Sequence, residues 1–81
     1  MVVHFENVGN AKRSWDADLP LLSSQTLHRE IKRKKALASK HLEFTMEVDG
    51  NDTIGHIHAG MRTVGTFRVK GALHMAIPIN L

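Results

Sequence analysis

The sequence of 81 residues contains no cysteine. Without cysteine there are no disulfide bonds, no zinc sites built on thiolates and no cysteine nucleophile, and this composition is compatible with a reducing compartment. A chain of this length buries only ~60% of the surface that it exposes when unfolded, so its core is small. The supports that remain open to such a fold are a metal site built from histidine and carboxylate, or association with a second subunit.

Long apolar stretches and targeting signals are also missing. No segment approaches the roughly 20 apolar residues of a membrane-spanning helix. The N-terminal stretch MVVHFENVGNAKR lacks the basic lead and the apolar run of a secretory signal. No repeat, low-complexity segment or linker divides the chain. We therefore expect a single small domain over residues 1–81, located in the cytoplasm and without a membrane partner.

Features of an enzyme are scarce as well. No glycine-rich phosphate loop precedes a helix, and no histidine–carboxylate pair stands next to an obvious nucleophile. Ser23 and Ser24 stand where a helix begins, a position at which serine acts as a cap. We therefore expect no catalysis and no cofactor.

Residues 23–40 are predicted to form the one helix of the chain, because the interior SQTLHREIKRKKALASK contains neither glycine nor proline. At ~100° per residue, Leu27, Ile31 and Ala38 lie in one narrow apolar stripe that can face a core. The rest of the helix is strongly basic, and Glu30 is its only acid.

Positive charge concentrates on this helix. The chain has 11 Lys and Arg against 8 Asp and Glu, a net charge of +3, which suits nucleic acid or an acidic protein as a partner. Cations on an exposed helix face can each approach a phosphate, and binding through such contacts depends on salt. The residues that we predict to contact nucleic acid are Arg29, Lys32, Arg33, Lys35 and Lys40.

Alternation of apolar and polar residues predicts strands in the rest of the chain. The stretch HLEFTMEV has one apolar face, and DGND after it is a hairpin signal. The predicted strands are residues 2–8, 41–48, 53–59, 66–70 and 72–81, with 11–22 as a connection and 60–65 as a loop. The expected fold is α+β, with one amphipathic helix packed on a largely antiparallel four- to five-stranded sheet in the order β-α-β-β-β-β.

The last predicted strand, residues 72–81, has a long apolar face, and Pro78 indicates that it lies at a sheet edge or ends early. An apolar edge strand left unpaired invites association. It can pair with the N-terminal strand, or with a second copy in a homodimer or higher oligomer. An oligomeric assembly or accessory protein, of phage type or regulatory, is therefore the alternative to a nucleic-acid-binding module.

His56 and His58 lie two residues apart in a predicted strand and therefore point to the same face. A turn of two or four residues at 49–52 places Glu43 opposite His58 and Thr45 opposite His56, whereas a three-residue turn would bring both histidines to the core. Two imidazoles and a carboxylate form a zinc-type ligand set, but neighbours on a flat sheet diverge unless a bulge redirects them. We therefore expect exposed histidines without a metal, with Glu43 or Glu47 as neighbours and Glu43 within reach of one of them.

Two single residues carry predictions about packing. Trp15 lies in the predicted connection beside Asp16, where a tryptophan is either an exposed binding anchor or a lid over one end of the core. We predict the lid. Gly55, inside a predicted strand, is expected to mark a bulge or the close approach of another group.

Overall fold

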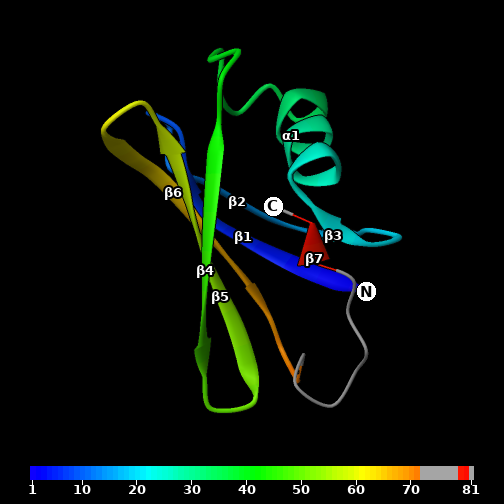
Figure 1. The fold of residues 1–81 in the computed structure, drawn as a ribbon. Helices are drawn as coiled ribbons and strands as arrows, with labels where there is room; N and C mark the ends of the chain where they lie inside the picture. Colours follow the sequence, from blue (N-terminus) through cyan, green and yellow to red (C-terminus); the bar gives the residue numbers. More distant parts are fainter. Residues whose placement is uncertain (72–78, 81) are drawn as a thin grey trace.

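The computed structural model describes residues 1–71 and 79–80 of the chain. Its elements, in chain order, are β1 (Val2–Val8), β2 (Arg13–Asp18), β3 (Leu22–Ser23), α1 (Ser24–Arg33), β4 (Glu43–Asp49), β5 (Asp52–Ala59), β6 (Arg62–Val69) and β7 (Ile79–Asn80). A five-stranded antiparallel sheet in the order β2-β1-β6-β5-β4 carries α1 on one face (Figure 1). The other face is open within the described residues, and β3 and β7 form a separate parallel pair.

This architecture confirms the predicted α+β class, and the order β-α-β-β-β-β matches apart from β2 and β3, which also precede α1. The prediction of residues 11–22 as a connection is wrong, because Arg13–Asp18 forms β2 along the edge of β1. Its outward positions hold serine and aspartate, and aspartate is depleted in strands, so the signal in the sequence is weak. The strand predicted over 72–81 lies outside the described residues except for 79–80, which pair with β3. Within the described residues no helix has the length and apolarity needed to cross a membrane.

The β4–β5 hairpin has the register that the sequence predicts. Glu43 pairs with His58, and Thr45 pairs with His56, across a two-residue turn that begins at Gly50. Gly50 has a φ of 63°, which suits the first central position of a type II′ turn and so follows the twist of the strands. Both histidines therefore lie on the open face of the sheet.

The β5–β6 hairpin has a shorter loop than predicted. The prediction of a loop over 60–65 is wrong, because β6 begins at Arg62 and only Gly60 and Met61 form the turn. A bulge beside His58 shifts the register between β5 and β6, and such a shift obscures the period-two pattern on which the prediction depends.

The helix α1 begins as predicted but is shorter than the predicted 23–40, since it ends at Arg33. Ser23 is its N-cap, with its Oγ accepting a hydrogen bond from the amide of Thr26 at 3.1 Å. The hydroxyl of Thr26 accepts in turn from the amide of Ser23 at 3.1 Å. This reciprocal pair satisfies two amides that would otherwise have no partner at the start of the helix.

The core fills the space between α1 and the covered face of the sheet. From the predicted apolar stripe, Leu27 and Ile31 are fully buried, whereas Ala38 lies beyond the helix and is exposed. Trp15 stacks on Phe5, with ring centroids 4.7 Å apart, and packs against the edge of the core, which confirms its prediction as a lid. The buried apolar residues are Val3, Phe5, Val8, Leu19, Leu22, Leu27, Ile31, Phe44, Ile57, Phe67 and Val69.

Candidate functional site

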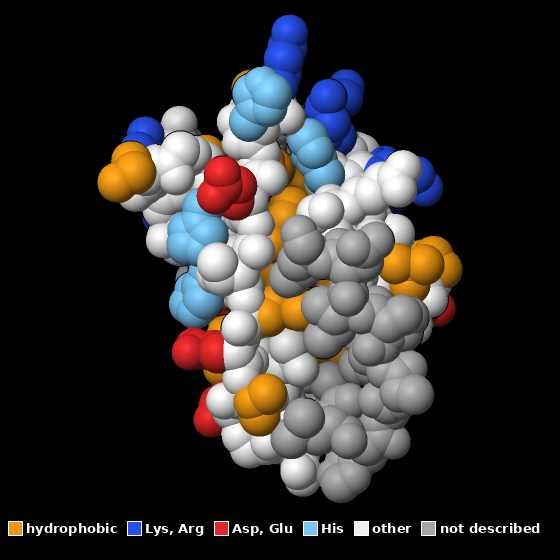
Figure 2. Space-filling model, viewed as in Figure 1, with side chains coloured by type: hydrophobic (Ala, Val, Ile, Leu, Met, Phe, Trp, Pro, Cys, Tyr) orange, Lys and Arg blue, Asp and Glu red, His pale blue; other side chains and the backbone are white. Residues whose placement is uncertain are grey.

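Lysine and arginine side chains gather at one end of the molecule, the upper end in Figure 2. Three segments meet there: the β1–β2 turn at 9–12, the β5–β6 turn at 60–61 and the connection from α1 to β4 at 34–42. We define the basic end by its cations, which are all exposed except the half-buried Lys34: Lys12, Arg13, Lys32, Lys34, Lys35, Lys40 and Arg62.

Direct contacts hold these segments in place. The amide of Gly9 donates to the carbonyl of Val64 at 2.9 Å, which joins the first turn to β6. The guanidinium of Arg13 donates to the carbonyl of Lys34 at the end of α1. A Cβ on Gly9 would lie 2.1 Å from the carbonyl oxygen of Ala36, so only glycine allows the turn to pass this close to the connection. The basic end is therefore built into the fold.

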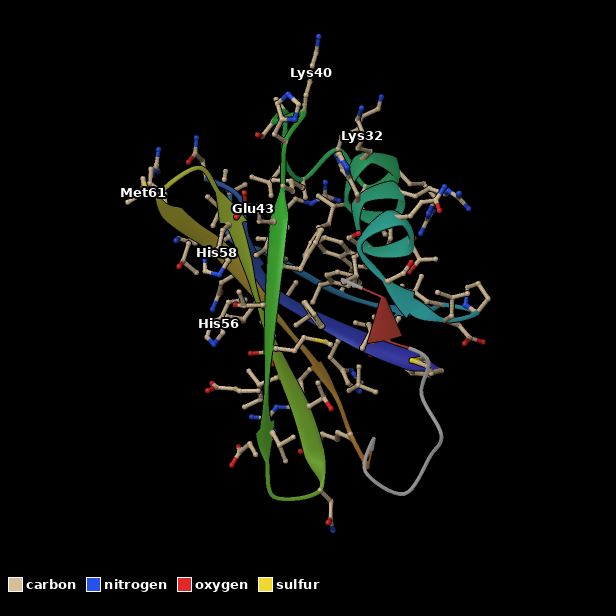
Figure 3. The ribbon with its side chains drawn as sticks, viewed as in Figure 1. Lys32, Lys40, Glu43, His56, His58 and Met61 are labelled. Carbon is tan, nitrogen blue, oxygen red and sulfur yellow. The ribbon has the colours of Figure 1, made fainter. Side chains whose placement is uncertain are left out.

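Most acidic residues lie away from the basic end, but Glu43, which directly follows the connection at 34–42, lies beside it (Figure 3). Along the strands they occupy the positions that alternate away from the core, so they line the open face and the β4–β5 turn. Glu30, on α1, is the exception. The acids of the open face and the turn are Glu6, Asp16, Asp18, Glu43, Glu47, Asp49 and Asp52. The modest net charge of +3 is thus unevenly distributed, with one acid, Glu43, bordering the basic end.

Two arginines outside the basic end are neutralised by ion pairs. Nη2 of Arg33 lies 2.8 Å from Oε2 of Glu30, and Nη1 of Arg68 lies 2.7 Å from Oδ2 of Asp52. Within residues 1–71, no cation of the basic end takes part in an ion pair. Its charge is therefore free to meet an anionic ligand.

The chain leaves α1 through a Schellman motif whose central position is a lysine. The amide of Lys35 donates to the carbonyl of Lys32 at 3.0 Å, and the amide of Ala36 donates to the carbonyl of Ile31 at 3.2 Å, the two bonds that define the motif. Lys35 has a φ of 54°, and Lys12 in the β1–β2 turn has a φ of 52°. Glycine usually occupies such left-handed positions, because a side chain there costs roughly 1–2 kcal/mol. Two cations of the basic end therefore stand where the backbone is strained.

The structure separates the five cations that were predicted to share a helix face. Lys32 is on α1, whereas Lys35 and Lys40 lie beyond its end, so the prediction of one helical face is wrong. These three still belong to the basic end. Arg33 is paired, and Arg29 lies on the side of the helix, where it lines a small hollow with Pro20.

Four members of the basic end were not among the predicted site residues: Lys12, Arg13, Lys34 and Arg62. Lys12 and Arg62 stand in or beside turns that glycines mark in the sequence. What the sequence does not show is that the two turns are neighbours. That follows from the antiparallel pairing of β1 with β6, in which Phe5 lies opposite Phe67.

His56 and His58 lie side by side on the open face, with ring centroids 6.3 Å apart (Figure 3). Nε2 of His56 lies 3.3 Å from Oε1 of Glu47. Nε2 of His58 is 2.9 Å from the hydroxyl of Thr45, and its Nδ1 is 3.3 Å from the hydroxyl of Thr63. Each imidazole thus contacts a side chain on a neighbouring strand.

The weak metal candidates His56, His58 and Glu43 are not assembled into a site. The carboxylate that reaches a histidine is Glu47, one of the two predicted neighbours, and not Glu43, which was expected to reach one. Both ring nitrogens of His58 already contact hydroxyls. No group of three His, Asp or Glu side chains in the described part of the chain is placed to hold a metal ion.

A hollow of about 450 Å³ on the open face contains a second polar cluster. Nδ1 of His4 lies 2.6 Å from Oδ1 of Asp16, and Glu6, Ser14, Arg68 and Lys70 complete the polar lining. Two acids face two cations here, so the hollow offers an anion much less net attraction than the basic end does.

The aromatic residues take no part in the surface of the basic end. The chain has three phenylalanines, one tryptophan and no tyrosine. All four rings belong to the core or pack against it: Phe5, Trp15, Phe44 and Phe67. None of these four rings is therefore presented for stacking on a base.

Comparisons of the chain with protein-family models, with curated proteins and with solved structures find no match.

Proposed function

We propose that this protein is a small non-enzymatic module that binds the phosphate backbone of double-stranded nucleic acid with its basic end. The observation that carries the proposal is the gathering of seven cations at the basic end, while most of the acids lie on the open face. Cations gathered in this way attract a polyanion over a distance and contact its phosphates directly. The left-handed Lys12 and Lys35 support the proposal, because backbone strain retained at two charged positions is typical of a functional surface.

The width of the basic end suits a duplex. The molecule measures 33 × 22 × 21 Å, and the basic end lies at one extremity of it. A duplex carries one negative charge per ~1.7 Å of its axis, so about 12 phosphate charges fall within a length of ~20 Å. The cations of the basic end therefore have enough partners without any reading of base identity.

A duplex fits better than a single strand or a membrane. Proteins that bind single strands use aromatic side chains as stacking platforms, and the aromatic rings here are in or against the core. Membrane association requires an apolar face beside the cations, but Met61 is the one large apolar side chain exposed at the described part of this end. Contacts with the phosphates of a duplex require neither an aromatic platform nor an apolar face, only exposed cations.

Salt-dependent binding tests this proposal. The purified protein is titrated into a labelled duplex and followed by fluorescence anisotropy, from about 50 to about 200 mM salt. If six cations contact phosphates, the slope of log K against log salt is about −5, and affinity falls about 10³-fold over this range. Absence of binding at the lowest salt, or tighter binding to phosphatidylserine vesicles than to the duplex, would overturn the proposal.

Two matched variants locate the contacts. Lys12→Gln with Lys40→Gln removes two charges from the basic end, and Arg29→Gln with Lys70→Gln removes two charges from outside it. We expect the first variant to reduce the salt slope by about 2 and the second to leave it unchanged, since each phosphate contact contributes about 0.9. Equal reductions in both variants would show that only net charge matters and that the basic end is not the site.

Assembly through terminal strands remains the alternative proposal, and the geometry favours it less. The described part of the last strand pairs with β3 of the same chain. The free edge of β4 is a poor self-association edge, because antiparallel pairing of two copies about Met46 would set Glu43 of each copy opposite Asp49 of the other, and like charges directly opposite are destabilising. Light scattering during the same titration distinguishes the two, since the assembly protein would be an oligomer without nucleic acid.

A further inference from the structure

Met61 is an exposed apolar side chain at one edge of the basic end. It is fully exposed at the tip of the β5–β6 turn, next to Arg62 in the chain (Figure 3). The other large apolar side chains exposed in the described residues lie elsewhere: Val2 at the start of β1, Leu21 ahead of α1 and Val48 near the end of β4. One apolar group therefore projects from a surface that is otherwise charged.

The tip that carries Met61 is narrow and fixed. Its neighbours Ala59 and Gly60 have little or no side chain, and Ala59 pairs with Arg62, so the β5–β6 ladder continues up to the turn. Gly60 has a φ of 65°, as a two-residue type II′ turn requires. The hairpin thus presents the methionine at a set position relative to the cations beside it.

We propose that Met61 enters the minor groove of a bound duplex and wedges between two adjacent base pairs, kinking the duplex toward its major groove. This inference rests on the proposed function and names the form of nucleic acid and the mode of binding. The minor groove is ~6 Å wide, which admits an unbranched, flexible side chain of this kind. Apolar wedges on minor-groove-binding proteins, methionine among them, unstack one base step and kink the duplex.

The energetic balance of the wedge has a testable consequence. Insertion removes the Met61 side chain from water. Bending also brings further phosphates toward Lys12, on the neighbouring β1–β2 turn, and toward Arg62, the next residue in the chain. These gains must offset the loss of base stacking. Because a mismatched base step is already weakly stacked, the wedge should favour a duplex that contains a mismatch.

The experiment uses two duplexes of the same sequence, one with a central mismatch, labelled at both ends for energy transfer. We expect wild type to bind the mismatched duplex about tenfold more tightly and to bring the ends of both duplexes closer together. Met61→Ala should bind the intact duplex within about threefold of wild type and lose both the preference and the bending. Met61→Leu, which restores an apolar side chain of similar size, should keep both.

The outcomes separate this inference from the proposed function. Wild type that binds without bending, or Met61→Ala that bends like wild type, overturns the wedge and leaves phosphate binding intact. Wild type that binds neither duplex at low salt overturns both. Met61 makes no contribution to the core, so equal unfolding midpoints for the three proteins show that the fold is the same in each.

Discussion

The indole Nε1 of Trp15 donates a hydrogen bond to Oε2 of Glu30 across 3.0 Å, which joins the edge strand β2 to the helix α1. The same carboxylate accepts from Nε and Nη2 of Arg33 at 2.9 and 2.8 Å. The side chain of Glu30 is only 7% exposed, and the ring of Trp15 stacks on Phe5 in the core. A polar bridge therefore fixes the helix that leads into the basic end.

Glu30→Ala should lower the free energy of unfolding by about 1–3 kcal/mol, because the half-buried indole N–H loses its acceptor. Glu30→Gln, which retains a carbonyl oxygen, should lose less. Urea unfolding followed by the fluorescence of Trp15 measures both. Glu43→Ala, exposed on β4, is the control and should stay within about 0.5 kcal/mol of wild type. A loss in Glu30→Ala no larger than in this control would contradict the role of the bridge.

Two carboxyl groups make the free energy of unfolding depend on pH in the acidic range. Hydrogen bonds from Arg33 lower the pKa of Glu30. Burial of the carboxyl group raises this pKa, and the hydrogen bond from Trp15 lowers it further. The pKa of Asp52 is lowered chiefly by the amide of Gly71, which donates to its Oδ1 at 3.0 Å. A carboxyl whose pKa is lower in the folded state contributes stability that is fully present above its unfolded pKa and is lost as pH falls through its folded pKa.

The unfolded pKa values are about 4.3 for Glu and about 3.9 for Asp. We therefore expect the free energy of unfolding to decrease below about pH 4.5. The double variant Glu30→Gln with Asp52→Asn should be less stable than wild type at pH ~6 and should lose less of its stability on acidification. Urea unfolding at a series of pH values compares the two. Parallel pH profiles would show that other carboxyl groups determine the acid sensitivity.

The elements that the sequence predicts well are those with local signals. The β4–β5 register follows from the two-residue turn and from alternation alone, which places Phe44 opposite Ile57. The helix start follows from Ser23. The helix end is missed because the left-handed position after α1 holds Lys35, where a glycine would have marked it.

The candidate site is harder to predict because it is assembled from distant segments. Its cations come from α1, from the connection after it and from strand ends and turns between residues 12 and 62, and none stands out within its own segment. Only the pairing of β1 with β6, together with the contact of Gly9 with the connection after α1, brings them to one end. Pairings of this long range have no signature in the periodicity of a single sequence.

Gly55 shows how a single position constrains the sheet. It lies opposite Phe67 on β6, and a Cβ there would be 2.0 Å from the Cζ of that ring, so the predicted close approach is confirmed. Gly55→Ala should destabilise the protein by about 1–3 kcal/mol through overpacking. With Phe67→Leu in the same chain the loss should be smaller than the sum of the two single losses. Strict additivity in chemical unfolding would contradict this contact.

Lys35 links stability to the proposed function. Lys35→Gly should raise the free energy of unfolding by up to about 1 kcal/mol, because glycine relieves the left-handed strain while the Schellman hydrogen bonds remain. The same substitution should weaken duplex binding and reduce the magnitude of the salt slope by about 0.9, since one phosphate contact is removed.

The matched control for this trade-off is Lys40→Gly, which removes a cation of the basic end from a position without left-handed strain. It should reduce the salt slope to the same extent without any gain in stability. Unfolding midpoints and anisotropy titrations on the same preparations provide both quantities. If Lys35→Gly were stabilised and bound the duplex as tightly as wild type, the strain at Lys35 would have no functional explanation. If it were stabilised and bound weakly, the lysine would be kept at a strained position for its charge, as expected where activity and stability conflict.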